Sequence, residues 1–307
     1  MRWVLAVWWV TISGAFTAGA SGGVLAAVER ALPYLEEEGV WWIEDKKCVS
    51  CHHTTFLVWA KDLAVEAGLD LDDAVLDDQR QWLLQSLLSP VVDSKTGEED
   101  PDKLKGDTNV EGVAQVLVST TAESLSSETS DALLVIIASN QLEEGGWKSG
   151  GQLPRQVRPE KETQWVSNQW MKTALGKAYE FEAEPDTGAM EAQTAEWYAM
   201  NVVLSQDEIS VDALLDRQNE DGGWSWIDGE SSSSTGTGQA LFALGRLGQL
   251  KRYKEALDRG RLYLIRSQSE DGHWETKSTK DRENSTRISD FWGSAWAVIG
   301  LLESWSD

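Results

Sequence analysis

The chain has 307 residues, and its 27 basic and 51 acidic side chains give it a net charge of −24. A chain of this length can bury a large core and can form one or two domains. Such an acidic surface excludes the basic footprint through which proteins bind nucleic acid or anionic membranes. We therefore expect no nucleic-acid partner.

The first twenty residues have the pattern of a secretory signal peptide. Met1-Arg2 is a short positive start, Trp3–Phe16 carries no charge, and Ala18-Gly19-Ala20 is a small-x-small cleavage site. The alternative is an uncleaved membrane anchor, although the apolar run is shorter than a spanning helix. We predict a signal peptide at 1–20, a domain at 21–307, a periplasmic or otherwise extracytoplasmic location, and no membrane span after signal removal.

Helical patterns dominate the rest of the chain, and alternating β-branched runs are nearly absent. Most predicted helices have an apolar face at spacings of three and four residues. The predicted helices are Gly23–Glu38, Thr54–Gly68, Asp72–Leu88, Val110–Thr120, Glu128–Gln141, Glu162–Phe181, Glu191–Ser205, Glu208–Gln218, Gly236–Leu247, Tyr253–Gln268 and Ser289–Ser304. The sequence therefore predicts an all-α protein.

The two cysteines of the chain lie in the loop between the first two predicted helices, as Cys48-Val49-Ser50-Cys51-His52. This spacing is typical of c-type haem attachment, in which two thiols bind the porphyrin and the adjacent imidazole reaches the iron. The sequence therefore predicts haem c held by Cys48 and Cys51, with His52 as an iron ligand.

Alternatives for this motif remain open. Cys48 and Cys51 could form a disulfide or a redox dithiol, or bind zinc with His52 and His53, although no further thiolate is available. The candidates for a sixth iron ligand are His53, His273, Met171, Met190 and Met200. His273 is singled out because it replaces a glycine of a repeated turn, and His53 is too close to His52 to reach the opposite face.

One turn is repeated three times, as Gln141–Trp147, Gln218–Trp224 and Gln268–Trp274, and Leu35–Trp41 reads as a degenerate fourth copy. Each turn follows an apolar helix and precedes a polar loop. The Gln can bond backbone groups that a helix end leaves unpaired, and the Gly permits the left-handed conformation that ends a helix. The Trp supplies a large apolar plug between hairpins. These residues are therefore predicted to be structural.

The Gln-x-x-Asp-Gly-Gly-Trp pattern resembles the QW motifs of the squalene-cyclase and protein-prenyltransferase superfamily. The resemblance covers roughly Gly23 to the end of the chain. It implies a single α/α toroid domain, in which inner helices surround a cavity and outer helices pack around them. Because related toroids serve different reactions, the resemblance specifies the fold better than the activity.

A cyclase of this superfamily would protonate an alkene with an Asp of a D-x-D-D motif. Asp70–Asp73 matches the bare pattern, so Asp72 and Asp73 are weak catalytic candidates, and Asp290 is a third. However, Ala74 stands where the family has Thr or Ser, and this stretch also reads as the N-cap and first turn of a helix. A prenyltransferase zinc site is nearly excluded because no cysteine follows Cys51.

The remaining charged residues and the tryptophans have simpler interpretations. Arg155, Arg158 and Lys161 form a small basic group that a lyase could use, but a solvated loop is expected. The acidic Asp107 and Glu111 are also expected to be solvated. Helical tryptophans are expected in the core or as an aromatic cavity lining. The lining candidates singled out are Trp292 and Trp296.

These patterns lead to three functional hypotheses. The first is a haem-based redox or electron-transfer role with a redox partner protein, and the second is a cyclase-like enzyme for an apolar terpenoid-like ligand. The third is a non-catalytic binding module with a disulfide between Cys48 and Cys51. Substrate and redox partner cannot be read from the residues.

Overall fold

The computed structural model describes residues 16–48, 53–93, 95–119, 125–179 and 192–306. Each of the eleven predicted helices corresponds to one described helix. Their predicted ends differ by a few residues from the observed ones, and the predicted ends at Thr120, Phe181 and Glu191 lie outside the described residues. The helices are α1 (Phe16–Trp41), α2 (Thr54–Glu66), α3 (Asp73–Leu87), α4 (Val110–Ser119), α5 (Ser127–Ser139), α6 (Glu160–Tyr179), α7 (Ala195–Ser205), α8 (Glu208–Leu215), α9 (Ser234–Arg246), α10 (Lys254–Ser267) and α11 (Arg287–Glu303).

Two short antiparallel hairpins interrupt the helices. In the first, β1 (Pro90–Val92) pairs with β2 (Glu99–Leu104), and in the second, β3 (Trp224–Ser225) pairs with β4 (Ser232–Ser233). The second hairpin directly precedes α9 and therefore positions the loop at the start of that helix.

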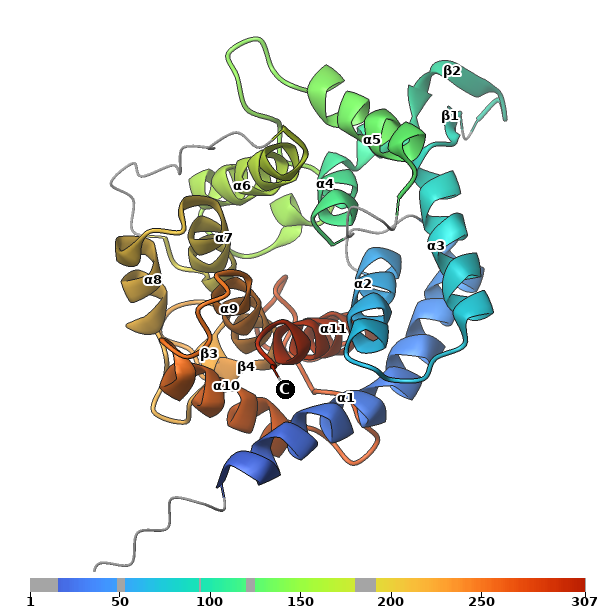
Figure 1. Cartoon of the computed structure of the whole chain (residues 1–307). Coiled ribbons are helices and arrows are strands. Elements are labelled where there is room, and N and C mark those ends of the chain that lie inside the picture. The colour runs from blue at the N-terminus through green and yellow to red at the C-terminus, as the bar shows by residue number, and fades with distance from the viewer. Residues whose placement is uncertain (1–15, 49–52, 94, 120–124, 180–191, 307) are drawn as a thin grey trace, which may run out of the picture.

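The helices form a closed ring, which Figure 1 shows in a view down its axis. In chain order α2, α4, α6, α7, α9 and α11 each pack against the next, and α11 packs against α2 to close the ring. The helices α3, α5, α8 and α10 pack outside α2, α4, α7 and α9, and α1 packs against α2, α10 and α11. The prediction of an all-α, single-domain α/α toroid is confirmed.

The tryptophan of each repeated turn joins an outer helix to the next inner helix. Trp147, Trp224 and Trp274 are almost fully buried. Their indole N–H groups donate to the carbonyl ten residues earlier, at 2.7–2.8 Å, in α5, α8 and α10. Their peptide N–H groups, at 2.9 Å, donate to side chains of α6, α9 and α11, namely Asn168, Thr237 and Ser294.

The glutamines of the second and third turns bond across to the neighbouring outer helix. Gln218 Nε2 donates to the carbonyl of Ala256 in α10 at 2.9 Å, and Gln268 Nε2 donates to that of Ala27 in α1 at 2.8 Å. Each Nε2 also donates at 2.8 Å to the glycine carbonyl within its own turn. The predicted structural role of the turns is confirmed by these contacts.

The prediction that Leu35–Trp41 is a degenerate fourth copy of the turn is wrong, because α1 continues as a helix through these residues. Gly39, which stands at the glycine position of that copy, lies where α1 meets α2. A Cβ atom there would stand 2.5 Å from Leu57 Cδ2. This glycine is therefore required by the close approach of two helices and not by a left-handed turn.

The N-terminal predictions are not tested. Most of the predicted signal peptide, residues 1–15, lies outside the described residues. No helix in the described ranges is both long and apolar enough to cross a bilayer. The signal peptide and the extracytoplasmic location stay predictions.

The turn at Gly272 can be tested by Gly272→Ala. Its φ is +93°, and a Cβ atom would lie 1.9 Å from the carbonyl oxygen of Arg30 in α1. Left-handed strain together with overpacking is expected to lower the free energy of unfolding by more than about 3 kcal/mol. Urea unfolding followed by circular dichroism measures the loss.

Gly248→Ala is the matched control, because Gly248 also has a positive φ (+66°) but nothing lies within 4 Å of the added Cβ. Its free energy of unfolding should fall only by the cost of the left-handed backbone, about 1–2 kcal/mol. Equal losses in the two variants would show that the contact between the third turn and α1 does not limit stability.

Candidate functional site

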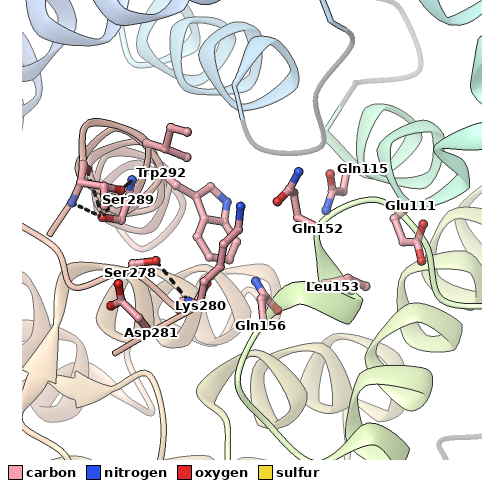
Figure 2. Close-up of a pocket in the computed structure, with 13 residues that line it drawn as sticks. Glu111, Gln115, Gln152, Leu153, Gln156, Ser278, Lys280, Asp281, Ser289 and Trp292 are labelled. Carbon is pink, nitrogen blue, oxygen red and sulfur yellow. Dashed lines mark hydrogen bonds between the residues drawn. The ribbon is translucent and has the colours of Figure 1, made fainter. Parts of the chain in front are cut away.

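A pocket of about 280 Å³ lies between α4 and residues 152–156 on one side, and α11 with residues 278–281 on the other (Figure 2). It is lined mostly by amide, hydroxyl and charged side chains. The lining residues are Glu111, Gln115, Gln152, Leu153, Gln156, Ser278, Thr279, Lys280, Asp281, Thr286, Ile288, Ser289 and Trp292.

Five of these residues carry polar atoms that the fold leaves unpaired. The atoms are buried and have no hydrogen-bond partner within the described ranges. They are Glu111 Oε2, Gln115 Oε1, Gln152 Oε1, Gln156 Oε1 and Trp292 Nε1. A buried polar atom without a partner costs about 1–3 kcal/mol. A ligand in the pocket can supply the missing partners, which the flexible glutamine side chains can meet by rotating.

Glu111 is held firmly at one oxygen and left unbound at the other. It lies in the first turn of α4 and is only 1% exposed. Its Oε1 accepts the N–H of Gly150 at 2.5 Å and the hydroxyl of Ser167 at 2.6 Å, whereas Oε2 has no partner in the described part of the chain. The expectation that Glu111 is solvated is wrong, because α4 is an inner helix.

The sequence does contain a signal for this site. Glu111 and Gln115 are four residues apart on a helix that is otherwise apolar, so they share one face. A polar pair on an otherwise apolar helix marks a buried polar site when every face of the helix is covered. The neighbouring Asp107 is partly buried, and it accepts hydrogen bonds from the peptide N–H of Leu104 and the amide of Asn140.

The two tryptophans singled out in the sequence lie in different surroundings. Trp292 is 8% exposed and lines the pocket. Trp296 is fully enclosed, with its ring 5.1 Å from Phe56, 5.7 Å from Trp59 and 5.6 Å from Phe242. Trp292 is therefore a pocket residue, and Trp296 belongs to the aromatic core.

The weak acid candidates do not lie in the pocket. Asp72 and Asp73 are exposed at the start of α3, an outer helix, where Asp72 Oδ1 accepts the N–H groups of Ala74 and Val75. Asp290 accepts the N–H of Thr276 at 2.7 Å. Burial raises the pKa of Asp290, while this hydrogen bond opposes the rise. None of the three candidate acids therefore lines this pocket.

Arg158 anchors the pocket segment that precedes α6. Its side chain is fully buried, and Nη1 lies 2.9 Å from Glu196 Oε2 on α7. Glu196 Oε1 accepts the indole N–H of Trp170 at 3.1 Å. The expectation of a solvated basic loop holds for the exposed Arg155 and Lys161 and is wrong for Arg158, because its segment runs into the ring.

The predicted haem motif lies largely outside the described residues. Cys48 is described, and its carbonyl accepts the indole N–H of Trp42 at 3.0 Å, but Cys51 and His52 are not described. Covalent haem, the disulfide and the zinc alternative are therefore not tested, and haem attachment stays a prediction. Among the described residues no group of three His, Cys, Asp or Glu side chains could hold a metal ion.

The candidate sixth ligands have well-defined surroundings. His273 stacks on Tyr34 at 5.0 Å, and its Nδ1 lies 2.6 Å from Asp271 Oδ1. His53 is buried between the rings of Trp42 and Phe291, at 3.9 and 4.2 Å. The other candidates are Met171 and Met200, which are buried in the core, and Met190, which lies outside the described residues.

No family model and no curated protein matches the chain. Solved structures with a similar arrangement include a glycosyl hydrolase family 88 protein from Bacteroides vulgatus (TM-score 0.46, 12% identity, 92% of this chain and 98% of that one). Two others are described as possible members of the GH105 family. The protein from Salmonella enterica serovar Paratyphi A has a TM-score of 0.38 and 12% identity over 92% of this chain and 82% of that one. The protein from Klebsiella pneumoniae has a TM-score of 0.37 and 13% identity over 92% and 81%.

The sequence-based resemblance to squalene cyclases and prenyltransferases is therefore wrong, because these similar structures are described as glycosyl hydrolases. The three functional hypotheses are corrected with it: haem-based electron transfer, terpenoid cyclisation and a non-catalytic binding module. The physical reason is that the repeated turn encodes how an outer helix is joined to an inner one. Any toroid built from such hairpins can use this turn, whatever its pocket does.

The anchoring role of Arg158 predicts that Arg158→Leu destabilises the protein strongly. It would leave the Glu196 carboxylate buried without its cation, which costs about 3–5 kcal/mol. Arg252→Ala, which removes an exposed pair with Glu208, is the control and should cost at most about 1 kcal/mol. Thermal unfolding of both variants measures the difference, and similar stability of the two would contradict the anchoring role.

Proposed function

We propose that the protein is a carbohydrate-active hydrolase that binds a sugar ring in the pocket between α4 and α11. The observation that carries the proposal is the concentration of unpaired polar atoms on the wall of one pocket, among them an oxygen of the buried carboxylate Glu111. A site that leaves polar groups unpaired selects ligands able to pair with them.

The lining matches the chemistry of a sugar. An amide offers both a donor and an acceptor, as a sugar hydroxyl does, so Gln115, Gln152 and Gln156 can each bond ring hydroxyls. Trp292 and Leu153 supply apolar surface for the C–H face of a ring. The volume of about 280 Å³ suits a small ligand group such as one ring.

Two carboxylates line opposite walls, Glu111 on α4 and Asp281 on the segment before α11 (Figure 2). Glycoside hydrolysis uses a carboxyl pair, one to protonate the leaving oxygen and one to activate water. Water adds to the anomeric carbon, the bond to the leaving oxygen breaks, and a proton is transferred to that oxygen. Glu111 Oε2 is the proton-transferring atom, because Oε1 is occupied by Gly150 and Ser167.

The test is hydrolysis of 4-methylumbelliferyl glycosides of neutral hexoses and of hexuronic acids by the wild type and by Glu111→Gln. The Gln side chain keeps an oxygen for the Gly150 and Ser167 bonds but cannot exchange the proton. We expect kcat/KM for the cleaved glycoside to fall by about 10²–10⁴-fold. The rate is measured from the fluorescence of the released methylumbelliferone.

Glu128→Gln is the matched control, because Glu128 is exposed on the outer helix α5. It should retain full activity. Hydrolysis of none of the glycosides by the wild type would refute the hydrolase proposal. Unchanged kcat/KM in Glu111→Gln would remove Glu111 from the proton transfer.

A further inference from the structure

A second pocket of about 270 Å³ lies beside the first. It is bordered by the β3–β4 hairpin, the start of α9 and residues 275–285. Ser278 and Thr279 line both pockets. The two pockets therefore share a wall of two hydroxyl side chains.

The second pocket also has unpaired buried groups of its own. Trp226 is 5% exposed and Thr235 is 1% exposed, and both line the pocket. Trp226 Nε1 and Thr235 Oγ1 have no hydrogen-bond partner within the described ranges. The backbone of Trp226 is fixed, because its carbonyl accepts the N–H of Ala195 at 2.9 Å. An indole N–H and a hydroxyl group can therefore bond a ligand from two different elements, the loop after β3 and the helix α9.

An ion pair spans this second pocket. Arg282 Nε lies 2.9 Å from Glu230 Oε1, which joins the 275–285 segment to the hairpin loop. Arg282 has φ +62°, a left-handed conformation that is costly for a residue other than glycine. Its N–H donates to the carbonyl of Ser278 at 2.7 Å, so the same strained turn also positions the shared wall. Strained residues of this kind concentrate at binding sites.

The hairpin side of the pocket is fixed by Tyr263, which also lines it. Its hydroxyl donates to the carbonyl of Ser232 at 2.7 Å. Burial raises the pKa of Tyr263 to about 12, so this hydroxyl keeps its proton well into the alkaline range. The pocket is therefore built from positioned elements and is not a gap between loose loops.

We infer that this pocket is a second saccharide subsite and that the substrate is an oligosaccharide of at least two rings, one in each pocket. The inference rests on the proposed function, because the first ring occupies the pocket of Glu111. The second ring would accept a hydrogen bond from Trp226 Nε1 and bond Thr235 Oγ1. Ser278 and Thr279 would contact the linkage region from the shared wall.

The experiment titrates the wild type, Trp226→Phe and Thr235→Val by calorimetry with mono-, di- and trisaccharides of glucose, galactose, mannose and galacturonic acid. Thr235→Val keeps the shape of the side chain and removes its hydroxyl group, and Trp226→Phe keeps an aromatic ring and removes the indole N–H. For the sugar that binds, we expect the wild type to bind the disaccharide about tenfold more tightly than the monosaccharide. The variants should lose most of this gain and keep the monosaccharide Kd.

Trp305→Phe is the control, because Trp305 also has a buried unpaired indole N–H but lines neither pocket. It should bind every sugar as the wild type does. Equal wild-type affinity for mono- and disaccharide, or an equal loss for both in Trp226→Phe, would overturn the second subsite and leave the proposed function standing. Wild-type protein that neither binds nor cleaves any sugar would refute the proposed function and the subsite together.

Discussion

The hydrogen bond from the turn tryptophan to the carbonyl ten residues earlier is the interaction on which the rest of the structure depends. It satisfies a backbone group at the end of an outer helix, and the peptide N–H of the same residue is bound by the next inner helix. Because Trp147, Trp224 and Trp274 make the same pair of bonds, three hairpins share one geometry. Repetition of that geometry turns successive hairpins in one direction and brings α11 back to α2.

The same turns decide where the pockets lie. The segment after Trp147 carries Gln152 and Gln156, the segment after Trp224 carries the hairpin loop, and the segment after Trp274 carries residues 275–286. Each leads into the N-terminal end of an inner helix. Thr235 and Ser289 also lie in first turns of inner helices. The turns carry no candidate catalytic groups, but they bring polar loops together at the two pockets.

Local patterns predicted the elements well and the site poorly. The helices follow from apolar spacing, and the turns follow from a local residue pattern whose indole hydrogen bond spans only ten positions. Glu111 and Arg158 were expected in solvent because charged residues near loops usually are. Glu111 is bound by Gly150 and Ser167, 39 and 56 positions away, and Arg158 by Glu196, 38 positions away. Their burial therefore depends on contacts between segments that are distant in the sequence. The family assignment is wrong because the repeated Gln-to-Trp turn indicates only how a helical hairpin is closed. The identity of the residues that line the pocket does not depend on that turn.

The pocket itself discriminates between apolar and polar ligands. An apolar ligand would gain about 1.5–3 kcal/mol for each large apolar side chain that it covers, and the pocket offers Leu153, Ile288 and Trp292. The same ligand offers no partner to the five buried polar atoms, whereas a ligand that pairs one of them recovers the roughly 1–3 kcal/mol that an unpaired atom costs. A ligand with hydroxyl groups on its edge and C–H groups on its face satisfies both sets, because the amides line one side of the pocket and the Trp292 indole lies on the other.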